Sequence, residues 1–444
     1  MAVDVAVIGA GASGLSCAAA LAKNGATVVV FEADDRIGGR IRTSAATPLE
    51  LGAQVVHGAR NPLLALLGDA AVPDTRTESA HAVTGGRLVS MGDLARGGHP
   101  PWAVEERLTA NPGPAAGTVA SWLAFHIPAD APRLVAAEWF RQNWAGAPVD
   151  LAPVGIAAAR RRDSVGAGAF TVAGGFTELP RRLAAGLDIR LGHAVRRVRW
   201  RAGQAELSIS GPGGGQGTKE PVVKETARAV VVTAPPPVVA AGRLVIEDLP
   251  RVKLAAAHGL GLGDGCCLAV TLDHAAPQAS VVFDADGRAG FVRSWAGRPD
   301  VLVVAKAGAA ATVRAAAGSG GLATLLATAL PWSAGARVTG TEVADWGASP
   351  WITGAFTFPR PGLGWAPGAW ARPVAGTVFF AGEATWTSGP PSVHGAMASG
   401  ERAAGEVLAA LGTGLPNTDL PSTALPTTAL PTTGATSSYP EVRA

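Results

Sequence analysis

VAVIGAGASGL, at residues 5–15, is the stretch of sequence that decides the fold class. A short β-rich run at 3–8 leads into it. An alanine- and leucine-rich helix is expected over 15–23, and a second apolar strand over 27–31. A strand, a glycine-rich turn, a helix and a strand in this order predict an α/β unit whose two strands are parallel.

Three glycines in this turn have the G-x-G-x-x-G spacing of a dinucleotide-binding motif. Gly9 permits the tight turn, Gly11 lets a pyrophosphate approach the backbone, and Gly14 lets the helix pack on the strand. Ala12 and Ser13, within the same turn, are also expected to bind the cofactor, and the N-terminus of the helix that follows faces the phosphates with free N–H groups and a partial positive charge. The turn therefore predicts a site for a dinucleotide cofactor.

An acidic residue ends the second strand. Glu32 is placed to accept hydrogen bonds from ribose hydroxyls, and its charge would repel a 2′-phosphate. NADP is thereby disfavoured, whereas NAD and FAD are both compatible with this unit.

Two further motifs favour FAD over NAD. In RIGGRIRT, Gly39 belongs to a glycine pair that permits close backbone approach, and Arg40 supplies a fixed charge for a second phosphate. Near the C-terminus, TVFFAGEATW places Gly382 and Glu383 at the end of a strand, where a ribityl chain could be held. SVHGAMASG then opens a helix of small residues on which a flat ring can lie, with a positive helix end beneath it.

Composition bounds the remaining classes. A chain of 444 residues with 48% hydrophobic and 16% charged residues predicts a folded protein of two or three domains. The net charge of +3 and scattered arginines give no basic stripe for nucleic acid, and three cysteines fit neither a disulfide framework nor a metal site. No signal peptide and no membrane span is apparent, so we expect a cytoplasmic protein.

In this order, the motifs resemble those of the flavin-containing amine oxidase family, which includes monoamine, polyamine and L-amino-acid oxidases and flavin-type histone demethylases. The resemblance covers residues 3–411. It is also carried by LELGAQVVHG (49–58), VAGGFTELPRRLA (172–184), HAVRRV (193–198), VVVTAPPPVV (230–239) and DWGASPWITGAFTF (345–358).

The resemblance implies an α/β protein in which a Rossmann-like FAD-binding domain of the glutathione-reductase type joins an α+β substrate domain with a mixed sheet. The FAD-binding domain would comprise residues 1–58, 174–245 and 372–411, and the substrate domain residues 59–173 and 246–371. Residues 412–444 are rich in Pro and Thr, with little to bury, and we expect a disordered tail there.

The resemblance also implies roles for residues along the cofactor. Glu32 would bind the adenosine ribose, and Arg40 would contact the pyrophosphate and the flavin side. Val195 would meet the adenine through its backbone, and Glu383 would hold the ribityl or diphosphate region. The residues expected to border the flavin ring are Gly52, Ala53, Gln54 and Val393. We expect non-covalent FAD, since residues 381–396 contain no cysteine.

The sequence departs from the family on the substrate side. Many members place a lysine under the flavin, and the family pattern puts Cys266 at that position. Many also place two aromatic rings over the flavin face, where this chain has Phe356 and Ser392. The cysteine is either a small buried apolar residue or a group that tunes flavin chemistry. His57 is either structural or part of the substrate cavity.

The resemblance implies an oxidase that transfers a hydride from a carbon, usually one bearing the nitrogen of an amine or amino acid, to flavin N5. O2 would accept the electrons and give H2O2. The family lysine and one of the two aromatic rings over the flavin are missing. This leaves an alternative, in which the chain is a dehydrogenase or an oxidative tailoring enzyme that acts on a bulky aromatic metabolite and not on an amine. A flavoprotein without enzymatic activity is a third interpretation. An apolar or aromatic small-molecule substrate is expected in either enzyme, and a homodimer is left open.

Overall fold

The computed structural model describes residues 3–74, 79–211 and 222–412. The predicted tail therefore lies outside the described residues, apart from Gly412.

The glycine-rich motif lies in a β–α–β unit, as the sequence predicts. Strand β1 (Val3–Ile8) leads through the turn into helix α1 (Ala12–Lys23), and the chain returns as β2 (Val28–Phe31), parallel to β1. Helix α1 begins three residues earlier than expected, because the glycine turn leads directly into it. The carboxyl end of β1 is thus the edge at which the motif meets the start of α1.

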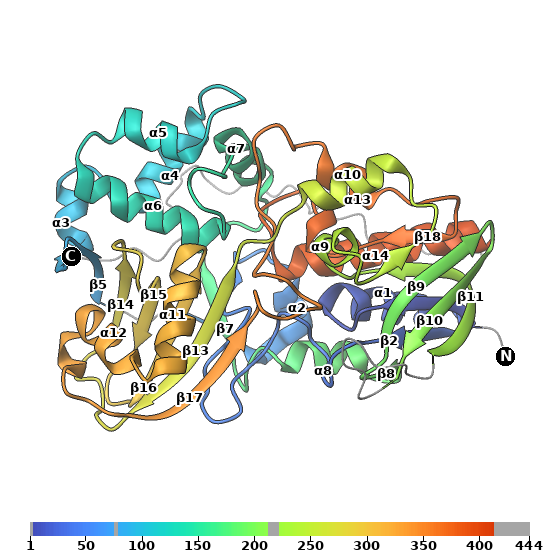
Figure 1. The fold of residues 1–444 in the computed structure, drawn as a ribbon, viewed down its shortest axis with the longest axis horizontal. Helices are drawn as coiled ribbons and strands as arrows, with labels where there is room; N and C mark the ends of the chain where they lie inside the picture. The colour runs from blue at the N-terminus through green and yellow to red at the C-terminus, as the bar shows by residue number, and fades with distance from the viewer. Residues whose placement is uncertain (1–2, 75–78, 212–221, 413–444) are drawn as a thin grey trace.

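This unit belongs to a mixed sheet that lies on the right in Figure 1. Its strands run in the order β12-β9-β10-β11-β1-β2-β8, with β18 also paired to β11. The strands outside the unit are β8 (Asp188–Arg190), β9 (Ala194–Arg201), β10 (Gln204–Ser210), β11 (Val222–Val232), β12 (Val245–Ile246) and β18 (Val378–Phe380). The strands of this sheet, β1 and β2 included, lie within the three segments predicted for the FAD-binding domain, apart from Ile246 of β12.

Alternate residues of β1 bury opposite faces of this sheet. Val5 and Val7 pack against α1 and α14 (Val393–Leu411), and Ala6 and Ile8 pack on the other face. That face is covered by α9 (Pro236–Ala240), α10 (Arg251–Gly259) and α13 (Ala366–Ala371). Since both faces are buried, the central strands are almost continuously apolar.

A second mixed sheet lies on the left in Figure 1. Its order is β17-β13-β16-β15-β14-β5-β6. Its strands are β5 (Ser79–Thr84), β6 (Arg87–Ser90), β13 (Gly265–Leu272), β14 (Ser280–Asp284), β15 (Phe291–Ser294), β16 (Asp300–Lys306) and β17 (Val338–Asp345). Helices α11 (Gly308–Ser319) and α12 (Leu322–Ala329) pack on one face, and the chain around Leu49 and Leu51 packs on the other.

A helical layer and a small sheet complete the structure. The layer is α3 (Met91–Arg96), α4 (Pro101–Ala110), α5 (Val119–His126), α6 (Asp130–Trp144) and α7 (Pro153–Arg162). The small sheet is β3 (Val56–His57), β7 (Ala169–Val172) and β4 (Ala71–Pro73). The remaining elements are α2 (Leu63–Leu67), α8 (Glu178–Ala184), and the 3₁₀ turns Gly68–Ala70, Pro331–Ser333 and Glu383–Thr385.

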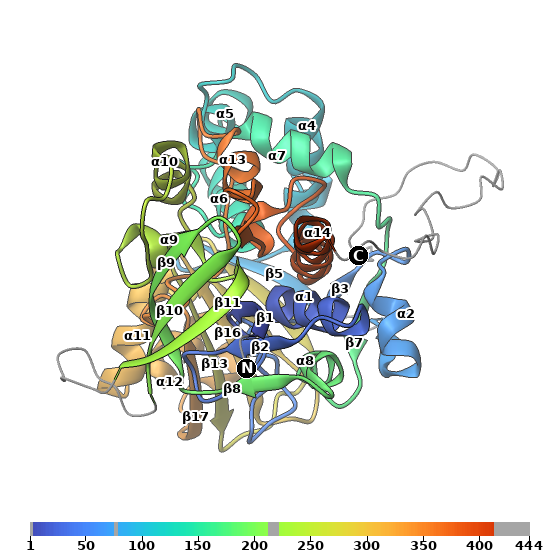
Figure 2. The same ribbon diagram turned by 90° about the vertical axis from the view of Figure 1, so that its right-hand side faces the viewer.

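Helices α1 and α14, from opposite ends of the chain, lie side by side (Figure 2). Small residues allow their close approach. A Cβ atom added at Gly400 would lie 2.2 Å from the carbonyl oxygen of Ser13. The C-terminal motif is thereby brought against the N-terminal glycine turn.

Candidate active site

The glycine turn between β1 and α1 has the backbone geometry that its sequence predicts. Gly9 has a φ of +106°, which an L side chain rarely adopts. A Cβ atom at Gly14 would lie 1.9 Å from the carbonyl oxygen of Gly9. Gly11 is different, since it has an ordinary φ of −77° and a Cβ atom there would have no neighbour within 4 Å. Gly9 and Gly14 are required by the fold, whereas Gly11 borders open space at the start of α1.

The predicted residues at the two ends of the chain are joined by two hydroxyl groups. Ser13 Oγ lies 3.2 Å from Ser399 Oγ on α14. The Ser399 hydroxyl in turn accepts a hydrogen bond of 2.9 Å from the backbone N–H of Gly382. Gly382 directly precedes Glu383, so the turn of residues 9–14 and the C-terminal motif form one buried network.

Glu32 lies beside the glycine turn and is almost fully buried. Its carboxylate accepts hydrogen bonds from the backbone N–H of Ala10 at 2.7 Å and of Asp34 at 2.9 Å. Desolvation raises the pKa of Glu32, and the two N–H donors act in the opposite direction. A carboxylate has about four lone-pair sites, so it can hold this turn and still accept from a ribose hydroxyl.

The glycine pair of RIGGRIRT packs on the first turn. Gly38 donates from its backbone N–H to the carbonyl oxygen of Ala10 at 2.8 Å. Gly39 has a φ of +56°, and a Cβ atom there would lie 3.3 Å from the Cα atom of Gly11. The sequence analysis missed Arg36, whose guanidinium donates to the carbonyl oxygens of Gly39 at 2.6 Å and Ile41 at 3.1 Å. Arg36 therefore fixes the conformation of the glycine pair.

Arg40 and Glu383 form an ion pair that joins distant segments. Nη1 of Arg40 lies 2.8 Å from Glu383 Oε1 and donates to the carbonyl oxygen of Ala355 at 2.9 Å. Glu383 also accepts from the Thr357 hydroxyl at 2.6 Å and from its N–H at 3.2 Å. Thr357, which sequence reasoning did not single out, and Ala355 flank Phe356. The ion pair thus positions the loop that carries the predicted aromatic residue.

The segment that follows Arg40 packs closely against it. A Cβ atom at Gly52 would lie 2.0 Å from the carbonyl oxygen of Arg40, and Ala53 donates to the same oxygen at 3.1 Å. Gln54 extends toward the second sheet, where its amide nitrogen lies 4.0 Å from Cys267 Sγ. The three residues predicted to border the flavin are therefore placed between Arg40 and the second sheet.

Two predicted cofactor contacts lie at opposite sides of this region. Val195 is a buried residue of β9 and pairs with Ile209 of β10. Val393 is the first residue of α14 and packs with Ile41 and Met397 in an apolar cluster beside the glycine turn. Their contacts with adenine and flavin stay predictions.

His57 belongs to a chain of polar groups that ends at α14. Desolvation, together with the charge of Arg160, lowers the pKa of His57 to about 4, so its imidazole is neutral near pH 7. Asn61 donates to the carbonyl oxygen of His57 at 2.8 Å, and the same amide lies 3.1 Å from His394 Nδ1. Ser392 Oγ lies 3.3 Å from His394 Nε2 and accepts from Gly395 N–H at 3.1 Å. The hydroxyl of Ser392 therefore serves as the N-cap of α14.

Cys266 and Cys267 lie on opposite faces of β13, and the position of Cys266 supports its interpretation as a small buried apolar residue. Successive strand residues point to opposite faces. Cys266 is buried with Leu268, under α11 and α12, whereas Cys267 packs with Leu49 and Leu51 on the opposite face. Burial raises the pKa of both thiols to about 12, so neither is a thiolate near pH 7. Cys267 is the cysteine on the side of the predicted cofactor.

Phe356 has an unpredicted neighbour. The Nζ atom of Lys306, at the end of β16, lies 4.7 Å from the centre of the Phe356 ring. Lys306 also donates to the carbonyl oxygen of Gln142 on α6. Desolvation lowers the pKa of Lys306 to about 8, and its charge contributes to the low pKa of His57. Lys306 is therefore in contact with Phe356 and within electrostatic range of His57, two residues that are expected near the substrate.

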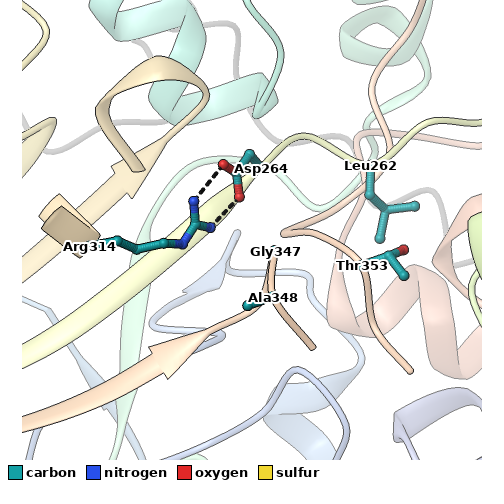
Figure 3. Close-up of a pocket in the computed structure, with 6 residues that line it drawn as sticks. All are labelled: Leu262, Asp264, Arg314, Gly347, Ala348 and Thr353. Carbon is teal, nitrogen blue, oxygen red and sulfur yellow. Dashed lines mark hydrogen bonds and ion pairs between the residues drawn. The ribbon is translucent and has the colours of Figure 1, made fainter. Parts of the chain in front are cut away.

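A pocket of about 370 Å³ lies elsewhere, at the start of β13 (Figure 3). Arg314 and Asp264 point toward one another across it and are joined by a bidentate ion pair. Arg314 also donates to Asp345 at 2.6 Å, so both carboxylates are neutralised by one guanidinium. None of the predicted site residues lines this pocket.

A known protein family matches nearly the whole folded region of the chain. It is described as flavin containing amine oxidoreductase, and its match covers residues 12–408. The chain belongs to this family. Its members are flavin-containing amine oxidoreductases, and FAD is the cofactor of the family.

Individual relatives agree with the family. The chain is 27% identical over 301 residues to probable polyamine oxidase 4 of Arabidopsis thaliana. The matched region covers 61% of the chain and 58% of that protein. The chain matches 17% to 58% of the length of the first three curated relatives. A cyclohexylamine oxidase from Brevibacterium oxydans IH-35A is similar in structure, with a TM-score of 0.74 and 20% identity over 93% of the chain and 100% of that structure. A putrescine oxidase bound to putrescine has a TM-score of 0.73 and 21% identity over 92% of the chain and 99% of that structure. These solved structures share the mixed α/β fold.

The described residues of this amine oxidoreductase fit the FAD that its family requires. No side chain caps the start of α1, and the position of Gly11 is open, so a phosphate can approach the helix N-terminus. Glu32 keeps acceptor capacity beside the same turn. Arg40 keeps unshared N–H groups beyond those that bind Glu383 and Ala355. No helix of residues 3–74, 79–211 or 222–412 is both long and apolar enough to cross a bilayer.

Proposed function

We propose that this chain oxidises an amine at the carbon that bears the nitrogen and that O2 is the electron acceptor, which gives H2O2. Bound FAD supplies the chemistry by accepting a hydride at flavin N5. The observation that carries the proposal is the convergence of the first glycine turn, Glu32, Arg40 and Glu383 in a chain whose family is defined by flavin and amine chemistry.

We propose a contact with FAD for each residue of the cofactor side. The Rossmann-like unit β1–α1–β2 would bind the pyrophosphate at Gly11, Ala12 and Ser13, and Glu32 would accept from the ribose. Arg40 would contact the pyrophosphate and the flavin side, with Glu383 holding it in place. Further residues proposed to line the cofactor are Gly9, Gly14, Gly39, Gly52, Ala53, Gln54, Val195, Gly382 and Val393.

The protein itself would orient the amine and exclude water. Phe356 is held by the Arg40–Glu383–Thr357 network, which leaves the ring as a rigid apolar wall. His57 is neutral because of its low pKa, so it adds no charge that would repel a protonated amine. A wall that holds the reacting carbon in the correct orientation would favour the loss of a hydride from it.

The alternative substrate, a bulky aromatic metabolite that is not an amine, has less support. The family is defined by amine chemistry, and the structures with the same fold include those of a putrescine oxidase and a cyclohexylamine oxidase. The absence of a family lysine had favoured the alternative. The structure places a different, partly buried lysine, Lys306, close to Phe356.

The test is anaerobic reduction of the purified yellow protein by a panel of monoamines, diamines and amino acids, followed in the visible flavin spectrum. We expect one class to bleach the flavin and O2 to restore it with release of H2O2. FAD should appear in the supernatant after acid denaturation, as non-covalent binding requires. A flavin that no amine or amino acid reduces, but an aromatic metabolite does, would establish the alternative.

A further inference from the structure

Lys306 lies on the sheet face that adjoins the candidate site. In β16, Val301, Val303 and Ala305 belong to the core under α11 and α12, whereas Leu302 and Val304 face the other way. Side chains alternate along a strand, so Lys306 shares the face of Val304. The register pairs Val304 with Cys267, which places Lys306 one step further along the face that Cys267 occupies.

The surroundings of the Lys306 ammonium give it no counter-ion. Nζ donates to the carbonyl oxygen of Gln142 and lies against the Phe356 ring. The nearby carboxylate of Glu138 is already bound by Arg141 at 2.9 Å and by the Gln142 amide at 2.6 Å. Among residues 3–74, 79–211 and 222–412, no ion pair involves Lys306.

Lys306 is partly buried, and its ammonium loses hydration without gaining a counter-ion, which is costly. A ligand that supplies the opposite charge would offset this cost. The single bond to Gln142 leaves two donor positions on Nζ, and either can form a charge-assisted hydrogen bond with a carboxylate oxygen. The Glu138 carboxylate is engaged by Arg141 and Gln142, and Phe356 and neutral His57 carry no negative charge.

We propose that Lys306 binds a carboxylate of the substrate, so that the amine oxidised by this protein is an amino acid with an apolar or aromatic side chain. This assignment rests on the proposed function and narrows it. A diamine is disfavoured by the same geometry, since its second ammonium would approach the ammonium of Lys306. The apolar or aromatic side chain follows from the Phe356 ring next to Nζ.

Binding of a carboxylate is tested first without turnover. Benzoate is titrated into the oxidised holoenzyme, and its dissociation constant is taken from the perturbation of the flavin spectrum. Lys306→Met removes the charge at similar volume, Lys306→Arg keeps it, and Lys224→Met removes an exposed lysine of β11. We expect Lys306→Met to weaken benzoate about ten- to hundredfold, as for loss of a charge-assisted hydrogen bond. Lys306→Arg and Lys224→Met should stay within about threefold of the wild type.

Substrate selection is tested with matched pairs that differ only by a carboxylate, phenylalanine with 2-phenylethylamine and tryptophan with tryptamine. Under anaerobic conditions the wild type should prefer the amino acid of each pair. Lys306→Met should raise the apparent dissociation constant of the amino acid about ten- to hundredfold and leave that of the amine unchanged. Equal benzoate binding in wild type and Lys306→Met would overturn the proposal, since Lys306 would then only bind Gln142. So would a variant that alters flavin reoxidation alone, because the reduced flavin would then be the anion.

Failure of the proposed function is a different result. If neither amines nor amino acids reduce the flavin, the amine chemistry is wrong whatever Lys306 binds. If amines do so and benzoate affinity is independent of Lys306, the amine chemistry stands and the amino-acid assignment is wrong.

Discussion

The cofactor side of this molecule is built largely from backbone groups in tight turns, whereas its substrate side is built from side chains of separate strands and loops. On the cofactor side, the first glycine turn, Glu32, the GGR turn and the C-terminal motif are adjacent in the structure. On the substrate side, Cys266 faces away from the site, Ser392 caps a helix, and Lys306 appears beside Phe356 without any signal in the sequence.

The difference has a physical cause. The cofactor motifs act through backbone groups in tight turns, and a turn is specified by a few consecutive residues. The substrate site uses side chains from separate strands and loops. A shift of one residue in a strand sends the side chain to the other face of the sheet, so a small error in alignment reverses the interpretation.

The largest effect on stability is expected from a substitution that distorts the backbone of the first glycine turn. Gly14→Ala places a Cβ atom 1.9 Å from the Gly9 carbonyl oxygen, and the fold should lose at least about 3 kcal/mol. FAD content and the thermal unfolding midpoint measure this. Gly11→Ala is the matched control, since its Cβ atom meets nothing within 4 Å. It should keep the fold and weaken FAD alone. Equal stability of the two variants would contradict the division of roles between these glycines.

The next effect tests the orientation of the two cysteines on the substrate side. Cys266→Lys would bury an ammonium among the apolar side chains under α11 and α12, which we expect to cost about 3–5 kcal/mol of unfolding free energy. Cys266→Ala should cost about 1 kcal/mol and leave the rate of anaerobic flavin reduction unchanged. A large change of that rate in Cys266→Ala would return Cys266 to the catalytic site.

A smaller effect, on the affinity for FAD, tests the proposed role of Glu32. Glu32→Gln keeps the shape of the side chain but removes the charge that a ribose hydroxyl would meet, and Glu32→Ala removes the acceptor altogether. We expect the dissociation constant of FAD to rise about tenfold in Glu32→Gln and about a hundredfold in Glu32→Ala. Titration of apoprotein with FAD measures both. Glu178→Gln, in a half-exposed ion pair on α8, is the control. Retention of wild-type affinity by Glu32→Ala would refute the ribose assignment.

The smallest effect concerns the charge state of His57. Its pKa in the folded protein is about 4, lowered from 6.5 by desolvation and Arg160 and opposed by Asp163. Between these values the unfolded chain binds a proton that the folded chain does not, so stability falls as the pH drops from 6.5 toward 4. His57→Gln should lose less thermal stability than the wild type over this range, by about one or two degrees. Identical pH profiles would show that folding leaves the pKa of His57 unchanged.

Several structural residues of the cofactor side were present in the quoted motifs but were not recognised. Arg36 belongs to RIGGRIRT, Thr357 to GAFTF and Ser399 to SVHGAMASG. Their roles depend on where a long or small polar side chain finds a carbonyl or carboxylate, and sequence spacing does not specify that. None of the quoted motifs contains Lys306, because its place beside the site follows from the pairing of β13 with β16.

The sequence by itself determined the β–α–β unit, the parallel pairing of β1 with β2, the family and the cofactor, since each depends on local turns and on apolar periodicity. Only the tertiary structure decided which cysteine faces the site, how Arg40 and Glu383 hold the Phe356 loop, and that an ammonium without a counter-ion lies beside that ring. These features arise where strands and loops distant in sequence meet, and the direction of a side chain there is fixed by strand register and packing.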